Sequence, residues 1–231
     1  MEPPPPLIVG MSRRNINLTF HGTGSCERPL EPGEDRVWVG EDELGSVLDA
    51  VTGRDDVRIT FDDGNVSDLD LALPAQRARG LRATFFIVAG RLGDPAFLSE
   101  DDVRALVAAG MGIGCHGMRH RPWRRLGDGA LREELVDAKK LLEGVVGLPV
   151  AEAACPFGAY DRRVLAALRA SGYQRVYTSD RGTARPDGWL QARNTLQNGE
   201  AIALVEHLLI GRTPVHNTLV RQPKLALKRW R

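Results

Sequence analysis

The chain has 231 residues, 42% of them hydrophobic, and its 31 basic and 30 acidic side chains leave a net charge of +1, which gives no support to nucleic-acid binding. Its three cysteines include no Cys-x-x-Cys pair, which excludes a disulfide scaffold or a zinc ribbon. No apolar run approaches the ~18 residues that cross a bilayer, and the first residues lack the apolar stretch of a secretory signal, so we expect a cytoplasmic protein.

Segments typical of strands alternate along the chain with segments whose apolar residues recur at helical spacing. We expect strands at residues 16–20, 57–61, 83–88, 111–115, 150–155, 175–178 and 190–196. We expect helices at residues 41–51, 67–80, 99–110, 131–146, 161–170 and 201–210. This alternation indicates a parallel sheet, open or closed into a barrel, with helices outside. We expect one domain at residues 15–210, between a proline-rich arm (1–14) and a basic tail (211–231).

Polar and titratable residues collect where the predicted strands end, and parallel α/β proteins place their functional groups at those ends. His21 follows the first strand, Asp62 and Asp63 the second, and His116 the fourth. The turn at residues 156–158 (Pro-Phe-Gly) follows the fifth. We therefore expect these groups to share one mouth of the sheet or barrel.

Asp62 and Asp63 are adjacent carboxylates, which repel each other unless a cation or a proton separates them. Strand alternation directs them to opposite faces unless the chain turns, and Gly64 permits such a turn. One carboxylate can then bind a metal while the other faces a substrate. A solvated turn without a metal is the alternative interpretation.

His116 and His120 have the spacing of a two-histidine metal site, because residues four apart meet on one face if the segment is helical. With one aspartate they would form a three-ligand set that leaves a position open, as in catalytic zinc sites. Imidazole and carboxylate ligands suit Zn, Co, Ni or Fe better than Ca or Mg. The alternative is a pair of surface histidines.

Together these residues resemble the polysaccharide deacetylase family (NodB homology domain, carbohydrate esterase family 4), near its poly-N-acetylglucosamine deacetylase branch. The first family motif, TFDDG, is intact at residues 60–64. The second, H-x-x-x-H, is His116 and His120, although Gly117 replaces the usual Ser or Thr. The third, a Pro-aromatic-Gly turn, matches residues 156–158.

The resemblance implies a distorted (β/α)7 barrel and a hydrolase that removes N-acetyl groups from an amino-sugar glycan or glycan precursor. It implies that Asp63, His116 and His120 hold a divalent metal, with zinc expected and Co, Ni, Fe or Mn as alternatives. A metal-activated water then attacks the amide carbonyl, with Asp62 as the base. The oxyanion is stabilised by the metal and by a backbone N–H near Phe157.

The chain departs from the family pattern at two functional positions. Ala154 stands where many members carry an arginine two residues before the proline, and we expect Arg193 to replace it. The late motif that ends in a catalytic histidine is not recognisable, because His207 lies in a helix pattern and His216 in a polar tail. We expect His21 to protonate the leaving amine instead; a loop histidine bonded to backbone is the alternative.

The candidate residues for substrate or oxyanion contact are Pro156, Phe157, Gly158, Trp123 and Arg193. Trp123 has two interpretations, stacking on a sugar face and packing in the core. The basic tail likewise predicts either contact with an anionic membrane surface or a solvated terminus. Two other functions stay open: hydrolysis of another non-peptide C–N bond, in a cyclic amide or an acylated polyamine, and glycan binding by a catalytically weakened barrel.

Overall fold

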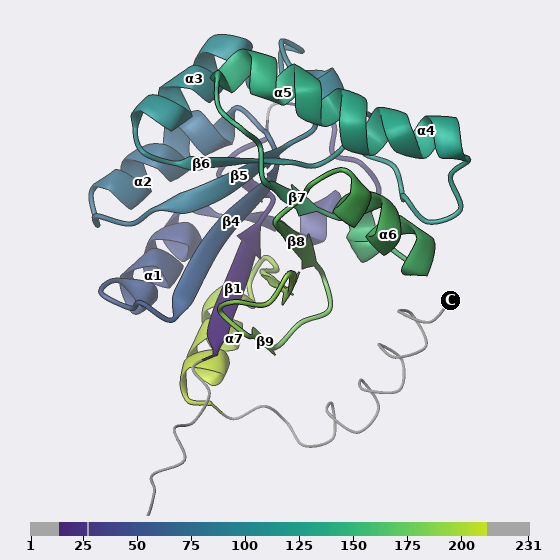
Figure 1. Ribbon diagram of the computed structural model, residues 1–231. Helices are drawn as coiled ribbons and strands as arrows, with labels where there is room; N and C mark the ends of the chain where they lie inside the picture. The colour runs from purple at the N-terminus through teal and green to yellow at the C-terminus, as the bar shows by residue number, and fades with distance from the viewer. Residues whose placement is uncertain (1–13, 27, 212–231) are drawn as a thin grey trace, which may run out of the picture.

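The computed structural model describes residues 14–26 and 28–211. A sheet at its centre curls into a nearly closed barrel with helices on the outside (Figure 1). In order of neighbours the sheet contains β10 (Leu190–Ala192), β8 (Arg175–Thr178), β7 (Glu152–Ala154), β6 (Gly112–Cys115), β5 (Ala83–Ile87), β4 (Val57–Asp63), β1 (Asn15–Phe20) and β11 (Asn194–Thr195). These neighbours pair in parallel, and only the short β9 (Thr183–Ala184) pairs antiparallel, with β1. The predicted distorted (β/α)7 barrel is confirmed.

The outer helices follow the strands in the predicted order. They are α1 (Glu41–Val51), α2 (Leu73–Arg77), α3 (Glu100–Ala108), α4 (Asp128–Arg132), α5 (Ala138–Val146), α6 (Arg162–Ala170) and α7 (Ala201–Leu209). Ser99 and Asp102 form the predicted capping box of α3, and Asp161 caps α6. Two π-helical segments that the sequence pattern did not predict precede α2 (Asp68–Ala72) and join α4 to α5 (Glu133–Asp137).

The two faces of the sheet differ in polarity. Phe20, Phe61 and Phe85, on three neighbouring strands, stack with ring centroids 5.0 and 4.9 Å apart on the face covered by helices. Because side chains alternate along a strand, Thr60 and Asp62 lie on the opposite face of β4, inside the barrel. The fold thus carries Asp62 to the carboxyl end of the barrel interior.

The barrel closes through the segment that joins β10 to β11. The strand that we predicted at residues 190–196 is broken at Arg193, because β10 pairs with β8 whereas β11 pairs with β1 across the opening. The amide of Asn17, on β1, donates to the carbonyl oxygen of Ala192 at 2.8 Å and so bridges the two edges. The prediction of one continuous strand was wrong, and the break leaves Arg193 between the two edges, nearly inaccessible to solvent.

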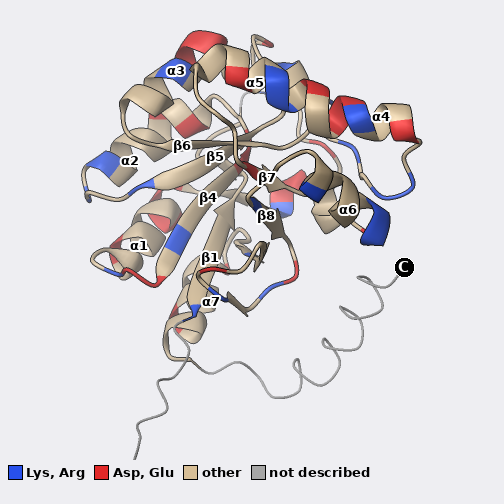
Figure 2. Ribbon diagram, in the orientation of Figure 1, with Lys and Arg blue, Asp and Glu red and all other residues tan. Residues whose placement is uncertain are grey.

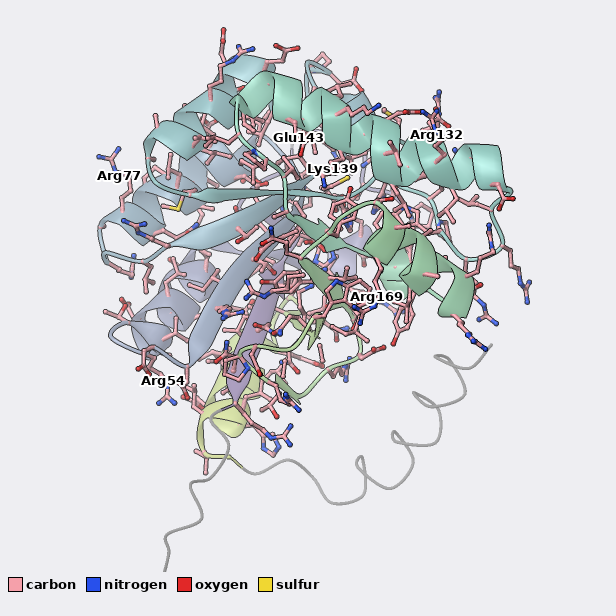
Figure 3. The ribbon with its side chains drawn as sticks, viewed as in Figure 1. Arg54, Arg77, Arg132, Lys139, Glu143 and Arg169 are labelled. Carbon is pink, nitrogen blue, oxygen red and sulfur yellow. The ribbon has the colours of Figure 1, made fainter. Side chains whose placement is uncertain are left out.

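On the outer helices, acidic and basic residues are intermixed (Figure 2). Arg77 on α2 and Arg132 on α4 project away from the barrel (Figure 3). Within the described residues, no helix combines the length and hydrophobicity needed to cross a membrane. Residues 1–13 and 212–231 lie outside the described part, and with them most of the expected arm and tail, His216 and the predicted membrane contact.

Candidate active site

A pocket of about 230 Å³ opens at the carboxyl end of the barrel. The predicted site residues that line it come from four separate stretches of the chain, and they are His21, Asp62, Asp63, His116, His120 and Phe157. The short strands β2 (Gly22–Thr23) and β3 (Trp38–Val39) pair with each other and return the intervening loop to the barrel. This loop contributes Glu31 and Glu34 to the pocket, and the 3₁₀ turn Ala89–Arg91 contributes Arg91. The predicted convergence at strand ends is therefore present in the fold.

Asp63, His116 and His120 form a compact cluster in this pocket, with ligand atoms that all lie within 4.8 Å of one another. Oδ1 of Asp63 lies 3.1 Å from Nε2 of His120 and 3.5 Å from Nε2 of His116. That oxygen is buried and accepts no hydrogen bond from the described residues. A buried carboxylate oxygen is costly to leave without a partner, and two imidazole nitrogens with one carboxylate are a ligand set that zinc accepts. These residues fit a divalent metal.

Left-handed backbone turns bring the three side chains together. The chain leaves β4 through Asp63 and Gly64, whose φ values are 80° and 75°. In the segment from His116 to His120, Gly117 has a φ of 87° and His120 itself a φ of 48°, so this segment is a loop. The condition of a helical segment is not met, and the two histidines are brought together by the turns of this loop instead. Each non-glycine residue in this region costs about 1–2 kcal/mol, and such strain is typical of functional sites.

Burial sets the protonation of this cluster. It lowers the pKa of His116 to about 3 and also lowers that of His120, so both imidazoles are neutral, the form that binds metals. Nδ1 of His116 lies 2.9 Å from the carbonyl oxygen of Ala154, which can only accept a hydrogen bond, so Nε2 is the free nitrogen that faces Asp63. Burial also raises the pKa of Asp63 to about 6.

Asp62 lies beside the cluster and is bound by Arg193. The guanidinium nitrogens Nη1 and Nη2 donate to Oδ1 and Oδ2 at 2.6 and 2.7 Å, in a bidentate pair that is almost fully buried. Burial alone would raise the pKa of Asp62, but the charge of Arg193, with a smaller contribution from His116, lowers it to about 2. Asp62 is therefore ionised at neutral pH.

The other predicted residues fall in different environments. His21 lines the pocket, and its buried Nδ1 has no hydrogen-bond partner among the described residues. Phe157 is 63% exposed at the rim, with its ring centroid 4.7 Å from that of His120, while its neighbours Pro156 and Gly158 are buried. Trp123 is fully buried and lies outside the pocket lining. Core packing is thus its correct interpretation, because a buried indole cannot stack on a sugar.

The sequence did not predict two ion pairs on the far wall of the pocket. Nη2 of Arg91 lies 2.7 Å from Oε1 of Glu31, and Arg28 binds Glu34 through both guanidinium nitrogens. The first pair attaches the loop between β2 and β3 to the turn Ala89–Arg91, whereas the second lies within the loop itself. The pair with Glu31 also keeps a guanidinium, that of Arg91, on the pocket wall.

A comparison with family models matches residues 49–176 to the model described as polysaccharide deacetylase. The Bacillus subtilis (strain 168) protein YxkH, which carries the name of a polysaccharide deacetylase, is 29% identical over 136 residues, or 59% of this chain. That match spans about half of the relative, 49% of its length.

Solved structures of deacetylases share the fold. The Streptococcus pyogenes deacetylase PplD superposes with a TM-score of 0.75 at 19% identity, over 87% of this chain and 99% of that one. IcaB from Ammonifex degensii superposes with a TM-score of 0.70 at 21% identity, over 84% of this chain and 96% of that one. At such low identities these similarities establish the architecture alone.

Proposed function

The chain belongs to the polysaccharide deacetylase family, and on that premise we propose that it is a metal-dependent hydrolase that removes N-acetyl groups from an amino-sugar glycan or a glycan precursor. The observation that carries the proposal is the cluster of Asp63, His116 and His120 beside an ionised Asp62 in one pocket. Residues 15–210 would act as one catalytic domain. The cytoplasmic location and the membrane contact of the tail stay predictions.

Asp63, His116 and His120 would hold the metal, with zinc as the first choice and Co, Ni, Fe or Mn as alternatives. Two features support this assignment: the imidazoles are neutral, and no donor among the described residues binds Oδ1 of Asp63. The chemistry that a bound divalent metal supplies is polarisation of the amide carbonyl and an increase in the acidity of water.

Asp62 would accept the proton of the attacking water. Arg193 holds both of its oxygens, so the carboxylate has one fixed orientation, with Oδ2 3.8 Å from Nε2 of His116. A carboxylate whose pKa is about 2 is a weak base. It can take this proton only from a water that the site has made more acidic, which is why base and metal ligands must be adjacent.

His21 would protonate the amine as the C–N bond breaks, because an amide anion is a poor leaving group. It lies on the pocket wall, and its Nδ1 is bound to no backbone carbonyl of the described residues. At the rim, the exposed ring of Phe157 offers a face to the sugar, and the backbone of the Pro156–Gly158 turn offers a contact for the oxyanion.

The test is release of acetate and of a free amine from N-acetylglucosamine oligomers by the full chain, stripped with a chelator and reloaded with zinc or cobalt. A parallel panel of cyclic amides and acetylated polyamines separates the sugar deacetylase from a small-molecule hydrolase. Activity that persists without metal, or a metal-loaded protein inert toward every N-acetyl sugar, contradicts the proposal. Metal analysis of Asp63→Ala and His120→Ala tests the three-residue ligand set directly.

A further inference from the structure

Glu134 is a fully buried acidic residue that the catalytic proposal does not use. It belongs to the π-helical segment Glu133–Asp137, which joins α4 to α5 in one long outer helix (Figure 1). Glutamate is almost never fully buried unless its carboxylate has partners. Those partners come from the loop that carries His116 and His120.

Four donors from this histidine loop and the residues just after it converge on Glu134. The main-chain N–H groups of Met118 and Arg119 donate to Oε2 at 2.8 and 3.4 Å. The indole N–H of Trp123 donates to the same oxygen at 3.3 Å. Nε of Arg121 donates to Oε1 at 2.7 Å. One carboxylate thus satisfies main-chain and side-chain donors that are otherwise left without partners at the base of the loop.

The opposite side of the histidine loop is held by the turn Ala89–Arg91. The N–H of Ala89 donates to the carbonyl oxygen of Gly117 at 2.9 Å, and the N–H of Gly90 donates to that of Met118 at 3.0 Å. The turn therefore binds carbonyl oxygens of the histidine loop, whereas Glu134 binds N–H groups of that loop. The two sets of bonds together fix the left-handed conformations at Gly117 and His120.

The absence of a side chain at Gly117 leaves room for the carboxylate of Glu134. A Cβ at this position would lie 2.3 Å from Oε2 of Glu134 and 3.0 Å from Nε1 of Trp123, closer than side-chain atoms tolerate. The Ser or Thr that is usual here in the family's second motif does not fit while Glu134 and Trp123 hold these places. The departure at Gly117 and the buried carboxylate are two parts of one arrangement.

We infer that Glu134 is a positioning residue for the metal site, which holds the histidine loop so that His116 and His120 both face Asp63. The inference rests on the proposed function in one respect, that this cluster binds a metal. Partners that orient metal ligands from outside typically change metal affinity by about 10–100-fold when they are replaced. Glu134→Gln places an amide N–H₂ among the donors that now bind a carboxylate, so the loop loses its fixed position.

The adjacent Glu133 provides a matched control. It is partly exposed, and it accepts hydrogen bonds from the side chains of Arg119 and Arg121 at 2.9 and 2.7 Å but from no main-chain group of the loop in the described structure. Glu133→Gln therefore removes the same charge at nearly the same place without releasing the loop backbone. We expect its metal affinity to equal that of the wild type.

The experiment titrates metal-stripped full-length protein with Zn²⁺ by calorimetry and with Co²⁺ by its d–d absorption, alongside thermal melts without metal. Glu134→Gln is expected to bind both ions about 10–100-fold more weakly and to change the Co²⁺ spectrum. A variant with a lowered melting temperature but wild-type affinity and spectrum would overturn the inference, because a purely structural role predicts that result.

Gly117→Ala provides the second variant, which decides the matter if Glu134→Gln does not fold. Its Cβ disturbs the loop while Glu134 stays in place, so we expect the same loss of metal affinity. Wild-type binding by Gly117→Ala overturns the inference and leaves the proposed function intact. Failure of the wild-type chain itself to bind either metal overturns the proposed function and the inference with it.

Discussion

Arg193 binds Asp62 through two parallel hydrogen bonds of 2.6 and 2.7 Å inside the barrel, where both side chains are almost inaccessible to solvent. Arg193 lies at the break between β10 and β11, the point at which the barrel closes. Arg193 therefore connects the point where the barrel closes to Asp62, the proposed base. Its replacement affects the orientation and the pKa of Asp62 together.

We expect Arg193→Ala to lower kcat/KM for deacetylation by about 10²–10⁴-fold, the range that general-base catalysis contributes. Without the guanidinium, the largest interaction that opposes the effect of burial on Asp62 is lost, so the pKa of Asp62 rises and the acid limb of the pH–rate profile moves to higher pH. Arg193→Lys keeps the charge but loses the bidentate geometry, so its kcat/KM is expected to lie between those of the wild type and Arg193→Ala.

The measurement is kcat/KM from pH 4 to 9, with thermal melts at each pH. Loss of one partner of a buried ion pair costs about 3–5 kcal/mol, so the melts establish that each variant is folded at the assay temperature. A folded Arg193→Ala protein whose acid limb stays in place would show that Arg193 does not control the ionisation of Asp62.

Local patterns predicted most of this fold. The apolar periodicity gave the order of strands and helices, and the side chains of Ser99 and Asp161 marked two helix starts that the structure confirms. The collection of His21, Asp62 and His116 at strand ends follows from the parallel arrangement, because such ends meet at one mouth. These features depend on residues within a few positions of one another.

Features that depend on distant contacts were not predicted. The break at Arg193 arises because one segment pairs with two different edges of the sheet, which no local pattern records. Glu134 lies three residues after Leu131 and four before Ala138, on the buried face of its helix, and its hydrogen-bond partners are 11–16 residues earlier in the chain. Gly117, where the family has Ser or Thr, was a sequence signal that a neighbouring group leaves no room for a side chain.

His21 is expected to matter only when the leaving group needs a proton. We expect His21→Ala to lower amide deacetylation by about 10²–10⁴-fold, while hydrolysis of p-nitrophenyl acetate is largely retained, because a nitrophenolate leaves without protonation. The two substrates are compared in the same metal-loaded preparation. His207→Ala, in α7 and outside the pocket lining, is the control and should change neither rate. Equal losses on both substrates would exclude the acid role.

Metal removal is expected to abolish activity and to lower stability. A ligand at 100 times its Kd stabilises a folded protein by about 2.7 kcal/mol, so zinc should raise the melting temperature of the stripped wild type. Asp63→Ala and His120→Ala should lose both this increase and the recovery of activity. Asp70→Asn, an exposed carboxylate that does not line the pocket, should behave as the wild type. A zinc-dependent increase that persists in Asp63→Ala would place the ion elsewhere.

Asp68 is a buried carboxyl group that lowers stability at neutral pH. It is fully inaccessible, and neither of its oxygens has a hydrogen-bond partner among the described residues. Burial, with the charges of Asp63 and Asp62, raises its pKa well above the ordinary value of 3.8. The folded chain therefore keeps a proton on Asp68 at a pH where the unfolded chain has released it.

The sign of the pH effect follows from this difference between the two states. Below pH 3.8 the folded and the unfolded chain both hold the proton on Asp68, so the free energy of unfolding does not depend on the ionisation of Asp68. Above pH 3.8 the free energy of unfolding falls by about 1.4 kcal/mol per pH unit until the pH reaches the pKa of Asp68 in the folded chain. Asp68→Asn, which is neutral at every pH, should be more stable than the wild type at pH 7 and should lose this advantage toward pH 4. Urea unfolding of metal-stripped protein between pH 4 and 8 measures the difference, with Asp70→Asn, an exposed position on the same segment, as the control. A constant difference across this range would mean that Asp68 is ionised in the folded chain.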